Sequence, residues 1–255
     1  MDFTVKKYTE LLDWLISKEY CFQTFDEFLK KPVSRSIILR HDVYLMPKNS
    51  LVFARIQHRK GVKGVYYFRA VKESWDENII KEIHELGHEI GYHYENLTTC
   101  KGSFEKGIKD FEYHLSELRK LAPVSTICMH GSPMSKFDSK DLWNNFDYKD
   151  FNIVGEPYFD VDFNKTYYIT DTGRKWDGGN VSVRDKVNTN LKLTFSKTNE
   201  IINAAKKNLL PNNIMFTFHP QRWNDNLYFW FRELILQNLK NVIKRLLYVK
   251  NKRIS

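Results

Sequence analysis

The chain has 255 residues, of which 42% are hydrophobic and 28% are charged. This composition is that of a globular protein and excludes a disordered chain. No apolar run approaches the roughly 18 residues that a membrane-spanning helix needs. Because one α/β barrel commonly takes about 250 residues, we expect a single domain over residues 1–255.

The formal net charge is +9, and most of the excess lies at the C-terminus. Residues 234–255 contain no Asp or Glu, whereas six are basic: Lys240, Lys244, Arg245, Lys250, Lys252 and Arg253. The remainder is not uniformly basic, so no nucleic-acid partner is expected. We interpret the segment as a solvated basic tail. A weak contact with an anionic membrane face or another partner is the alternative.

The first residues, MDFTVKKYTELLDWL, place Asp2, Glu10 and Asp13 within an apolar helical periodicity. This pattern is typical of an amphipathic helix and not of a signal peptide, so a cytoplasmic location is expected. The chain has three widely spaced cysteines, which argues against a disulfide framework. We interpret all three as structural: Cys21, Cys100 and Cys128.

Short apolar runs then alternate with helical periodicity. The runs predict strands at residues 37–39, 65–68, 90–93, 126–129 and 214–218, with a weaker one at 153–154. Helical patterns cover residues 48–60, 77–86, 104–118 and 227–246. This alternation predicts a parallel sheet with helices outside, either an incomplete barrel or an open doubly wound sheet.

The stretch from about 135 to 200 has a different character. It is polar and aromatic, and it includes the runs EPY, TDTGR and WDGG. Long segments of this kind in compact domains are usually functional, so we expect a substrate-facing insertion here. No glycine-rich phosphate-binding motif follows any predicted strand, which gives nucleotide binding little support.

Polar residues gather where the predicted strands end. Asp42 follows the first strand, His93 and Glu95 the third, His130 the fourth and His219 the last. In parallel α/β folds the active site forms at these carboxyl ends, so we expect the side chains to converge. A single histidine after a strand is more often structural, and it is the repeated position that favours function. The remaining histidines that lie on helices or turns are interpreted as structural: His58, His84, His88 and His114.

Three segments together resemble a known family. They are LRHDV at 39–43, GHEIGYH at 87–93 and His219-Pro220, and their order and strand context are similar to those of the polysaccharide deacetylase (NodB-like, carbohydrate esterase family 4) superfamily. A subgroup with the motifs RHDVD and GHEIGYHYE is the most similar. The resemblance extends to HGSP at 130–133, TDTGR at 170–174 and HPQRW at 219–223, and thus covers nearly the whole chain.

The resemblance implies a distorted, incomplete (β/α) barrel of the NodB-homology type. It also implies a hydrolase that removes acetyl groups from N-acetylated sugars with the help of a divalent metal, usually zinc. By position, Asp42 would be the general base, His219 the general acid and His93 a metal ligand. A carbohydrate or a sugar-derived small molecule is the partner that the resemblance implies.

Two departures from the family pattern affect the metal. Tyr44 stands where a second Asp is usual, and Leu97 stands where a second metal-binding His is usual. Tyr is a poor zinc ligand and Leu is none. Glu95 and His130 could complete a set with His93, or Asp42 could join as a ligand. We expect zinc to bind weakly or not at all.

Three interpretations therefore remain open. The first is a deacetylase or related amide hydrolase, and the second is a non-catalytic carbohydrate-binding or scaffolding relative that has lost its metal ligands. The third is a metal-independent amidase that uses Asp42, His130 and His219, with Arg40 or Arg222 to polarise the carbonyl. Four side chains are expected to contact substrate: Tyr44, Arg174, Trp176 and Trp223.

Overall fold

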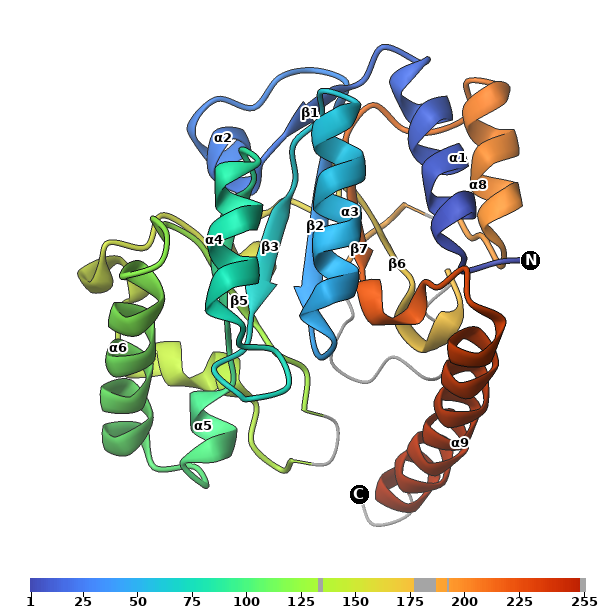
Figure 1. Ribbon diagram of the computed structural model, residues 1–255. Coiled ribbons are helices and arrows are strands. Elements are labelled where there is room, and N and C mark those ends of the chain that lie inside the picture. The colour runs from blue at the N-terminus through green and yellow to red at the C-terminus, as the bar shows by residue number, and fades with distance from the viewer. Residues whose placement is uncertain (133–134, 177–186, 192, 253–255) are drawn as a thin grey trace.

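A parallel sheet forms the centre of the computed structural model, which describes residues 1–132, 135–176, 187–191 and 193–252 (Figure 1). Its strand order is β5-β4-β3-β2-β7-β6, and β1 pairs with the first half of β2. The bounds are β1 Cys21–Gln23, β2 Ser36–Val43, β3 Val65–Phe68, β4 Glu89–Tyr94, β5 Ile127–Met129, β6 Tyr167–Thr170 and β7 Ile214–Phe218. Among the described residues the end strands β5 and β6 do not pair with each other. The expected distorted, incomplete (β/α) barrel is confirmed.

The strongest strand predictions coincide with β2, β3, β4, β5 and β7. The weak strand predicted at 153–154 is wrong. An isolated bridge between Thr126 and Gly155 is found there instead, and Ile153 is buried in the core. Strands β1 and β6 were not predicted. Strand β6 brings part of the segment from about 135 to 200 into the central sheet.

The helices lie around the sheet and begin at residues suited to capping. Thr4 caps α1 (Val5–Ile16), Thr24 and Glu27 form a capping box on α2 (Phe25–Lys30), and Pro47 opens α3 (Pro47–Arg59). The other helices are α4 Glu77–Glu85, α5 Asn96–Thr99, α6 Phe104–Arg119, α7 Pro157–Asp160, α8 Thr198–Lys206 and α9 Leu227–Lys252. The described part of the chain also has four short 3-10 helices: η1 Ser139–Asn144, η2 Tyr148–Phe151, η3 Thr172–Arg174 and η5 Pro220–Arg222.

Helix α9 departs from the expected arrangement. Figure 1 shows it projecting past the strand ends, away from the sheet, where it contacts η3 and η5. The predicted helix is present, but most of its predicted apolar face is exposed. The segment expected as a basic tail is helical as far as Lys252. Among the described residues, no helix is both long and apolar enough to cross a membrane.

Gly91 in β4 is required by a close approach. A Cβ atom at this position would lie 2.3 Å from the ring of Tyr67 on the neighbouring strand. The Tyr67 ring in turn lies 6.0 Å from the Arg40 guanidinium and 6.4 Å from the His93 ring. The glycine of the GHEIGYH run therefore lets an aromatic ring pack beneath the residues described next.

Candidate active site

Strand β2 carries a buried ion pair at its carboxyl end. Arg40 and Asp42 are two residues apart, so their side chains leave the same face of the strand. Arg40 donates from Nε to Oδ1 of Asp42 at 2.8 Å and from Nη2 to Oδ2 at 2.7 Å. Burial raises the pKa of the Asp42 carboxyl, but the Arg40 charge, supported by His93, outweighs this and holds it well below its usual range. Asp42 is thus a carboxylate at neutral pH.

His93 faces this carboxylate from β4. Its Nδ1 lies 2.9 Å from the carbonyl oxygen of Cys128, so Nδ1 carries the proton and Nε2 keeps its lone pair. Nε2 lies 3.7 Å from Oδ2 of Asp42. Burial lowers the pKa of His93 to about 3 despite the opposing Asp42 charge, so the ring is neutral at pH 7. Two electron-rich atoms therefore face each other, an arrangement that a cation or a bridging proton donor would match.

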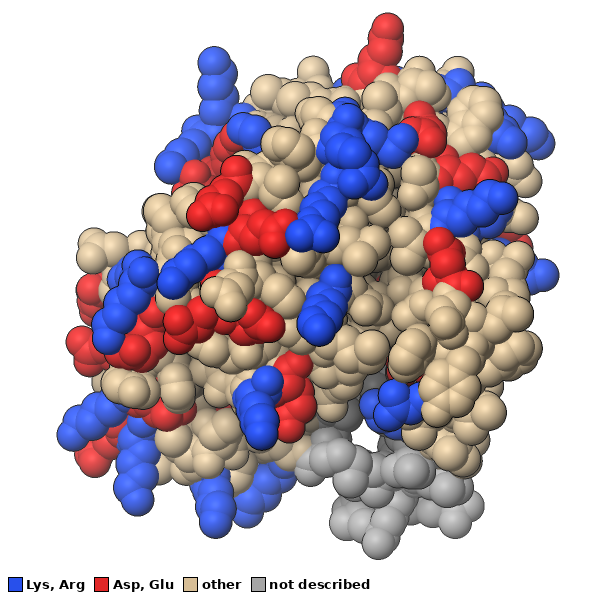
Figure 2. Space-filling view, in the orientation of Figure 1, with Lys and Arg blue, Asp and Glu red and all other residues tan. Residues whose placement is uncertain are grey.

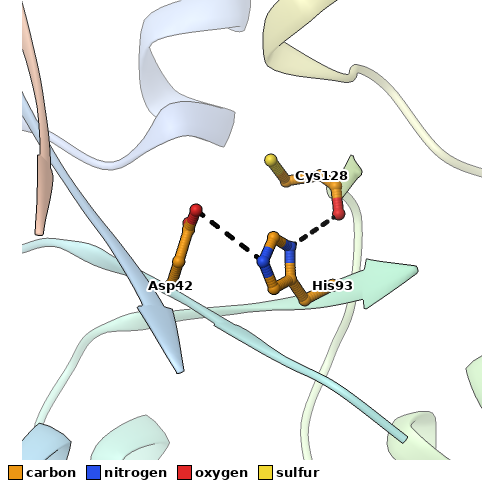
Figure 3. A group of neighbouring side chains, drawn as sticks. All are labelled: Asp42, His93 and Cys128. Atoms are coloured by element: carbon orange, nitrogen blue, oxygen red, sulfur yellow. Dashed lines mark hydrogen bonds and ion pairs between the residues drawn. The ribbon is translucent and has the colours of Figure 1, made fainter. Parts of the chain in front are cut away.

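Cys128 joins these two residues from β5. Figure 3 shows the three side chains pointing toward one another, and their ligand atoms all lie within 4.8 Å of each other. Oxygen, imidazole nitrogen and sulfur are all zinc ligands in proteins. The interpretation of Cys128 as a structural residue missed this placement, because the β4–β5 register that pairs it with His93 is a tertiary feature.

The other two expected ligands, Glu95 and His130, form a separate network. His130 Nδ1 lies 2.8 Å from Oε2 of Glu95, and Arg69 donates from Nε to Oε1 at 2.9 Å. Burial raises the pKa of Glu95, but His130 and Arg69 outweigh it and lower the pKa to about 2. Tyr44 stacks on His130 at 5.4 Å between ring centroids and receives the Arg69 guanidinium at 4.8 Å. Both oxygens of Glu95 are thus engaged, and Glu95 and His130 lie outside the Asp42 group.

His219 follows β7, on the other side of β2. The parallel register aligns His41 with Phe218, so His219 lies level with Asp42. Its Nδ1 is 2.6 Å from Oδ1 of Asp171, and its backbone N–H donates to Oδ2 at 3.0 Å. This fixes the tautomer, because an ionised carboxylate can only accept, and Nε2 is left to exchange a proton.

Asp171 was missed as a site residue. It is fully buried after β6 and also accepts hydrogen bonds from Arg222 Nη1 at 2.8 Å and Trp223 Nε1 at 2.7 Å. Burial raises its pKa, but the charges of His219 and Arg222 outweigh this and lower it. A signal was present in the sequence, since Asp171 directly follows the apolar run YYIT as Asp42 follows its own strand.

The residues expected to contact substrate are placed differently from one another. Tyr44 is half-buried beside His130. Trp176 and Trp223 are 3% and 1% exposed in an aromatic cluster, which does not support direct contact with substrate. Arg174 is also buried, with its guanidinium 4.7 Å from the Trp230 ring centroid. Leu97, at the second expected histidine position, packs in the core.

These side chains define an α/β protein with acid–base groups gathered at the carboxyl edge of its sheet. Asp42, His93 and Cys128 are adjacent, the His130 ring lies 5.1 Å from that of His93, and His219 lies beside Asp42 in the register. The catalytic, ligand and substrate roles given to these residues stay predictions.

Comparison with known proteins finds only distant similarity, and only to solved structures. No family model and no curated protein matches the chain. Among solved structures it is similar to a CE4 family pseudoenzyme from Bacillus anthracis, with a TM-score of 0.42 and 12% identity over 84% of this chain, and it spans 63% of that protein's length. It is also similar to the CE4 domain of a xylanase from the hindgut metagenome of Trinervitermes trinervoides, with a TM-score of 0.40 and 12% identity over 85% of this chain and 83% of that one. A third is PdaA of Bacillus subtilis, a family 4 carbohydrate esterase, with a TM-score of 0.36 and 16% identity over 82% and 86% of the two chains. Similarity this distant assigns no activity to the chain.

Proposed function

We propose that the chain is a deacetylase-like hydrolase that removes an N-acyl group, in the simplest case acetyl, from a sugar. One observation carries the proposal: a carboxylate held ionised by Arg40 and an imidazole held by the buried Asp171 lie on adjacent strands. Amide hydrolysis needs such a pair, because water must lose a proton and the leaving amine must gain one.

The geometry supports a distinct part for each group. Asp42 is ionised at any working pH and accepts the proton of the attacking water. In its imidazolium form His219 keeps the Nδ1 proton directed to Asp171 and can deliver the Nε2 proton to the leaving amine nitrogen. Because a carboxylate of strongly lowered pKa is a weak base, Asp42 alone supports only slow turnover.

A metal would be held by His93, Cys128 and Asp42. The donor set fits zinc in its elements, and when bound zinc supplies a Lewis acid that polarises the carbonyl and makes water more acidic. The fit is incomplete, because Arg40 occupies both oxygens of Asp42 and brings a full positive charge next to it. We therefore propose that zinc binds weakly.

A non-catalytic carbohydrate-binding or scaffolding role is the second candidate. The observations that favour it are the same Arg40–Asp42 pair together with Tyr44 and Leu97, which offer no ligand where the family has carboxylate and imidazole. In this alternative Tyr44, stacked on His130, would be a platform for a sugar ring.

Metal-independent hydrolysis has one specific observation in its favour. The Nη1 atom of Arg40 is buried and has no hydrogen-bond partner among the described residues, so this guanidinium retains an N–H group that could polarise a carbonyl. Arg222 is less suited to that part, because its Nη1 donates to the carboxylate and the carbonyl of Asp171.

The test is acetate release from N-acetylglucosamine oligomers, with added zinc and with a chelator. His219→Gln should lower turnover by roughly 10²–10⁴-fold, as for other acid–base groups. His114→Gln is the matched control, because His114 lies on α6 beside Asp110, away from the strand ends. Equal activity of His219→Gln and the unmodified protein would contradict the proposal. Sugar binding without any turnover would favour the non-catalytic role, and turnover that survives the chelator would favour the metal-independent one.

A further inference from the structure

One face of helix α9 is fixed to the body of the protein. Trp230 donates from Nε1 to the carbonyl of Asp2 at 2.7 Å, and its ring receives the Arg174 guanidinium. About three turns further on, Asn241 donates from Nδ2 to the carbonyl of Gly173 at 3.1 Å. These contacts near both ends of the described side chains set the rotation of the helix about its axis.

The opposite face is apolar and bare. Each of its large side chains is more than half exposed: Leu227 56%, Tyr228 70%, Phe231 52%, Ile235 60%, Leu239 57% and Val242 53%. At 100° per residue these positions fall within an arc of about 120°, so they form one stripe. Where the first turns of α9 lie in Figure 1, at the lower right, the coloured surface in Figure 2 is mostly tan, which marks uncharged residues. A continuous exposed apolar surface of this kind marks an interaction site.

Charge identifies the kind of partner. Residues 234–255 contain six basic residues and no acidic ones, so the region attracts an anionic surface. Pairing with a second copy would oppose two segments of like charge. The stripe also combines aromatic rings, Tyr228 and Phe231, with aliphatic chains, which is typical of helices that lie in the headgroup region of a bilayer.

We propose that α9 is an interfacial helix that binds the surface of an anionic bilayer, with its apolar stripe inserted and its axis parallel to the membrane. The same helix borders the candidate site, because the Lys240 ammonium lies 5.6 Å from the Tyr44 ring centroid. Docking through α9 therefore holds the site against the bilayer. On the basis of the proposed function, the substrate is an N-acylated sugar carried by a membrane lipid.

Vesicle co-sedimentation tests the docking. The protein should pellet with phosphatidylglycerol vesicles, much less with phosphatidylcholine vesicles, and less in high salt. Ile235→Asp combined with Leu239→Asp should weaken binding by at least about 10-fold, since both charges enter the inserted face. Val52→Asp is the control, because Val52 is an exposed apolar residue on α3, at 41%. Pelleting of the double variant at the unmodified level would overturn the proposal.

Two further measurements keep the result interpretable. Phe231→Trp adds a reporter whose emission should shift to the blue and be quenched by brominated phosphatidylglycerol. If light scattering shows that the unmodified protein is a dimer that does not bind vesicles, and that the double variant is a monomer, the stripe is a self-association surface and the proposal fails.

The substrate step is tested separately, with a lipid-linked and a free N-acetylated sugar as alternative substrates. Faster hydrolysis of the lipid-linked form in anionic vesicles supports it. If the protein hydrolyses the free sugar and does not bind vesicles, the membrane proposal is wrong and the proposed hydrolase function is supported. If the protein binds vesicles and hydrolyses neither form, the proposed hydrolase function is wrong and the membrane proposal is supported.

Discussion

The two halves of the sheet's carboxyl edge differ in how many of their polar side chains have a partner. On the β2–β7–β6 side, each carboxylate oxygen of Asp42 and Asp171 is matched by a donor, and His219 has a fixed tautomer. On the β4–β5 side, His93 and Cys128 face Asp42, while Tyr44 stacks on His130 and Leu97 packs in the core. The comparison teaches that the carboxylates of Asp42 and Asp171 already have partners within the fold, whereas a cation at Asp42 would have to compete with Arg40.

Removing the charge of Asp42, on the β2–β7–β6 side, should have the largest effect. Asp42→Asn should lower turnover by roughly 10²–10⁴-fold, since it removes the proton acceptor. It also leaves Arg40 buried without a counter-charge, and breaking a buried pair from one side costs about 3–5 kcal/mol of unfolding free energy. Acetate release and urea denaturation measure the two effects.

The matched control for this change removes both charges. Arg40→Met with Asp42→Leu should be as inactive as Asp42→Asn but regain most of its lost stability, because an apolar pair leaves no unpaired charge. If Asp42→Asn is as stable and as active as the unmodified protein, the Arg40–Asp42 pair is neither structural nor catalytic and the contrast between the two halves disappears.

Zinc titration tests the β4–β5 side, where His93 and Cys128 face Asp42. Cys128→Ser should weaken zinc binding by at least about 10-fold if sulfur is a ligand, and Cys100→Ser should not change it. Arg40→Gln should strengthen binding, because it removes the competing positive charge from Asp42. Isothermal titration calorimetry of the three variants decides this, and equal affinity of Cys128→Ser and the unmodified protein excludes the Asp42–His93–Cys128 group as the site.

A smaller effect concerns stability against pH. The pKa of His93 is lowered to about 3 by burial, against about 6.5 for histidine in an unfolded chain. Between these values the unfolded chain binds a proton that the folded chain does not. Stability therefore falls as pH drops through this window, by up to about 1.4 kcal/mol per pH unit for one such residue.

His93→Gln should remove this part of the slope, whereas the surface variant His114→Gln should retain the slope contributed by His93. His41, whose pKa burial also lowers to about 3, adds slope of the same sign and stays in both variants. Urea denaturation at pH 7, 6 and 5 compares the two. If the slope of stability against pH is the same in His93→Gln as in the unmodified protein, the pKa of His93 is not lowered by folding.

The sequence predicted the elements whose patterns are long and local. Strand β2 is buried along its whole length and β7 is a continuous apolar run, so both were recognisable. Strands β1 and β6 are no shorter than β5 and β3, but their sequences are less apolar: β1 is CFQ, with an exposed Cys21, and β6 lies within a polar and aromatic stretch. The exposure of the α9 stripe could not be read from periodicity either, because a helical pattern gives a face but not what covers it.

The candidate site was predicted in its positions but not in its partners. The strand ends drew attention to four residues that lie along the carboxyl edge of the sheet: Asp42, His93, His130 and His219. That Glu95 bonds His130, and that Cys128 lies beside His93, follows from the β4–β5 register, which no local pattern encodes. Asp171 lies 48 residues before His219 in the chain, so only the folded sheet brings the two together.

The i,i+2 spacing of Arg40 and Asp42 has a consequence for protein engineering. A designer who wishes to transplant an always-ionised carboxylate needs only one buried strand, since the counter-charge travels with it. No loop has to be copied. His219 cannot be transplanted in this way, because its partner Asp171 follows β6 and is itself held by Arg222 and Trp223. The Arg40–Asp42 pair can thus be transferred as part of one strand. The His219–Asp171 pair can be transferred only together with β6, β7 and the residues that hold Asp171.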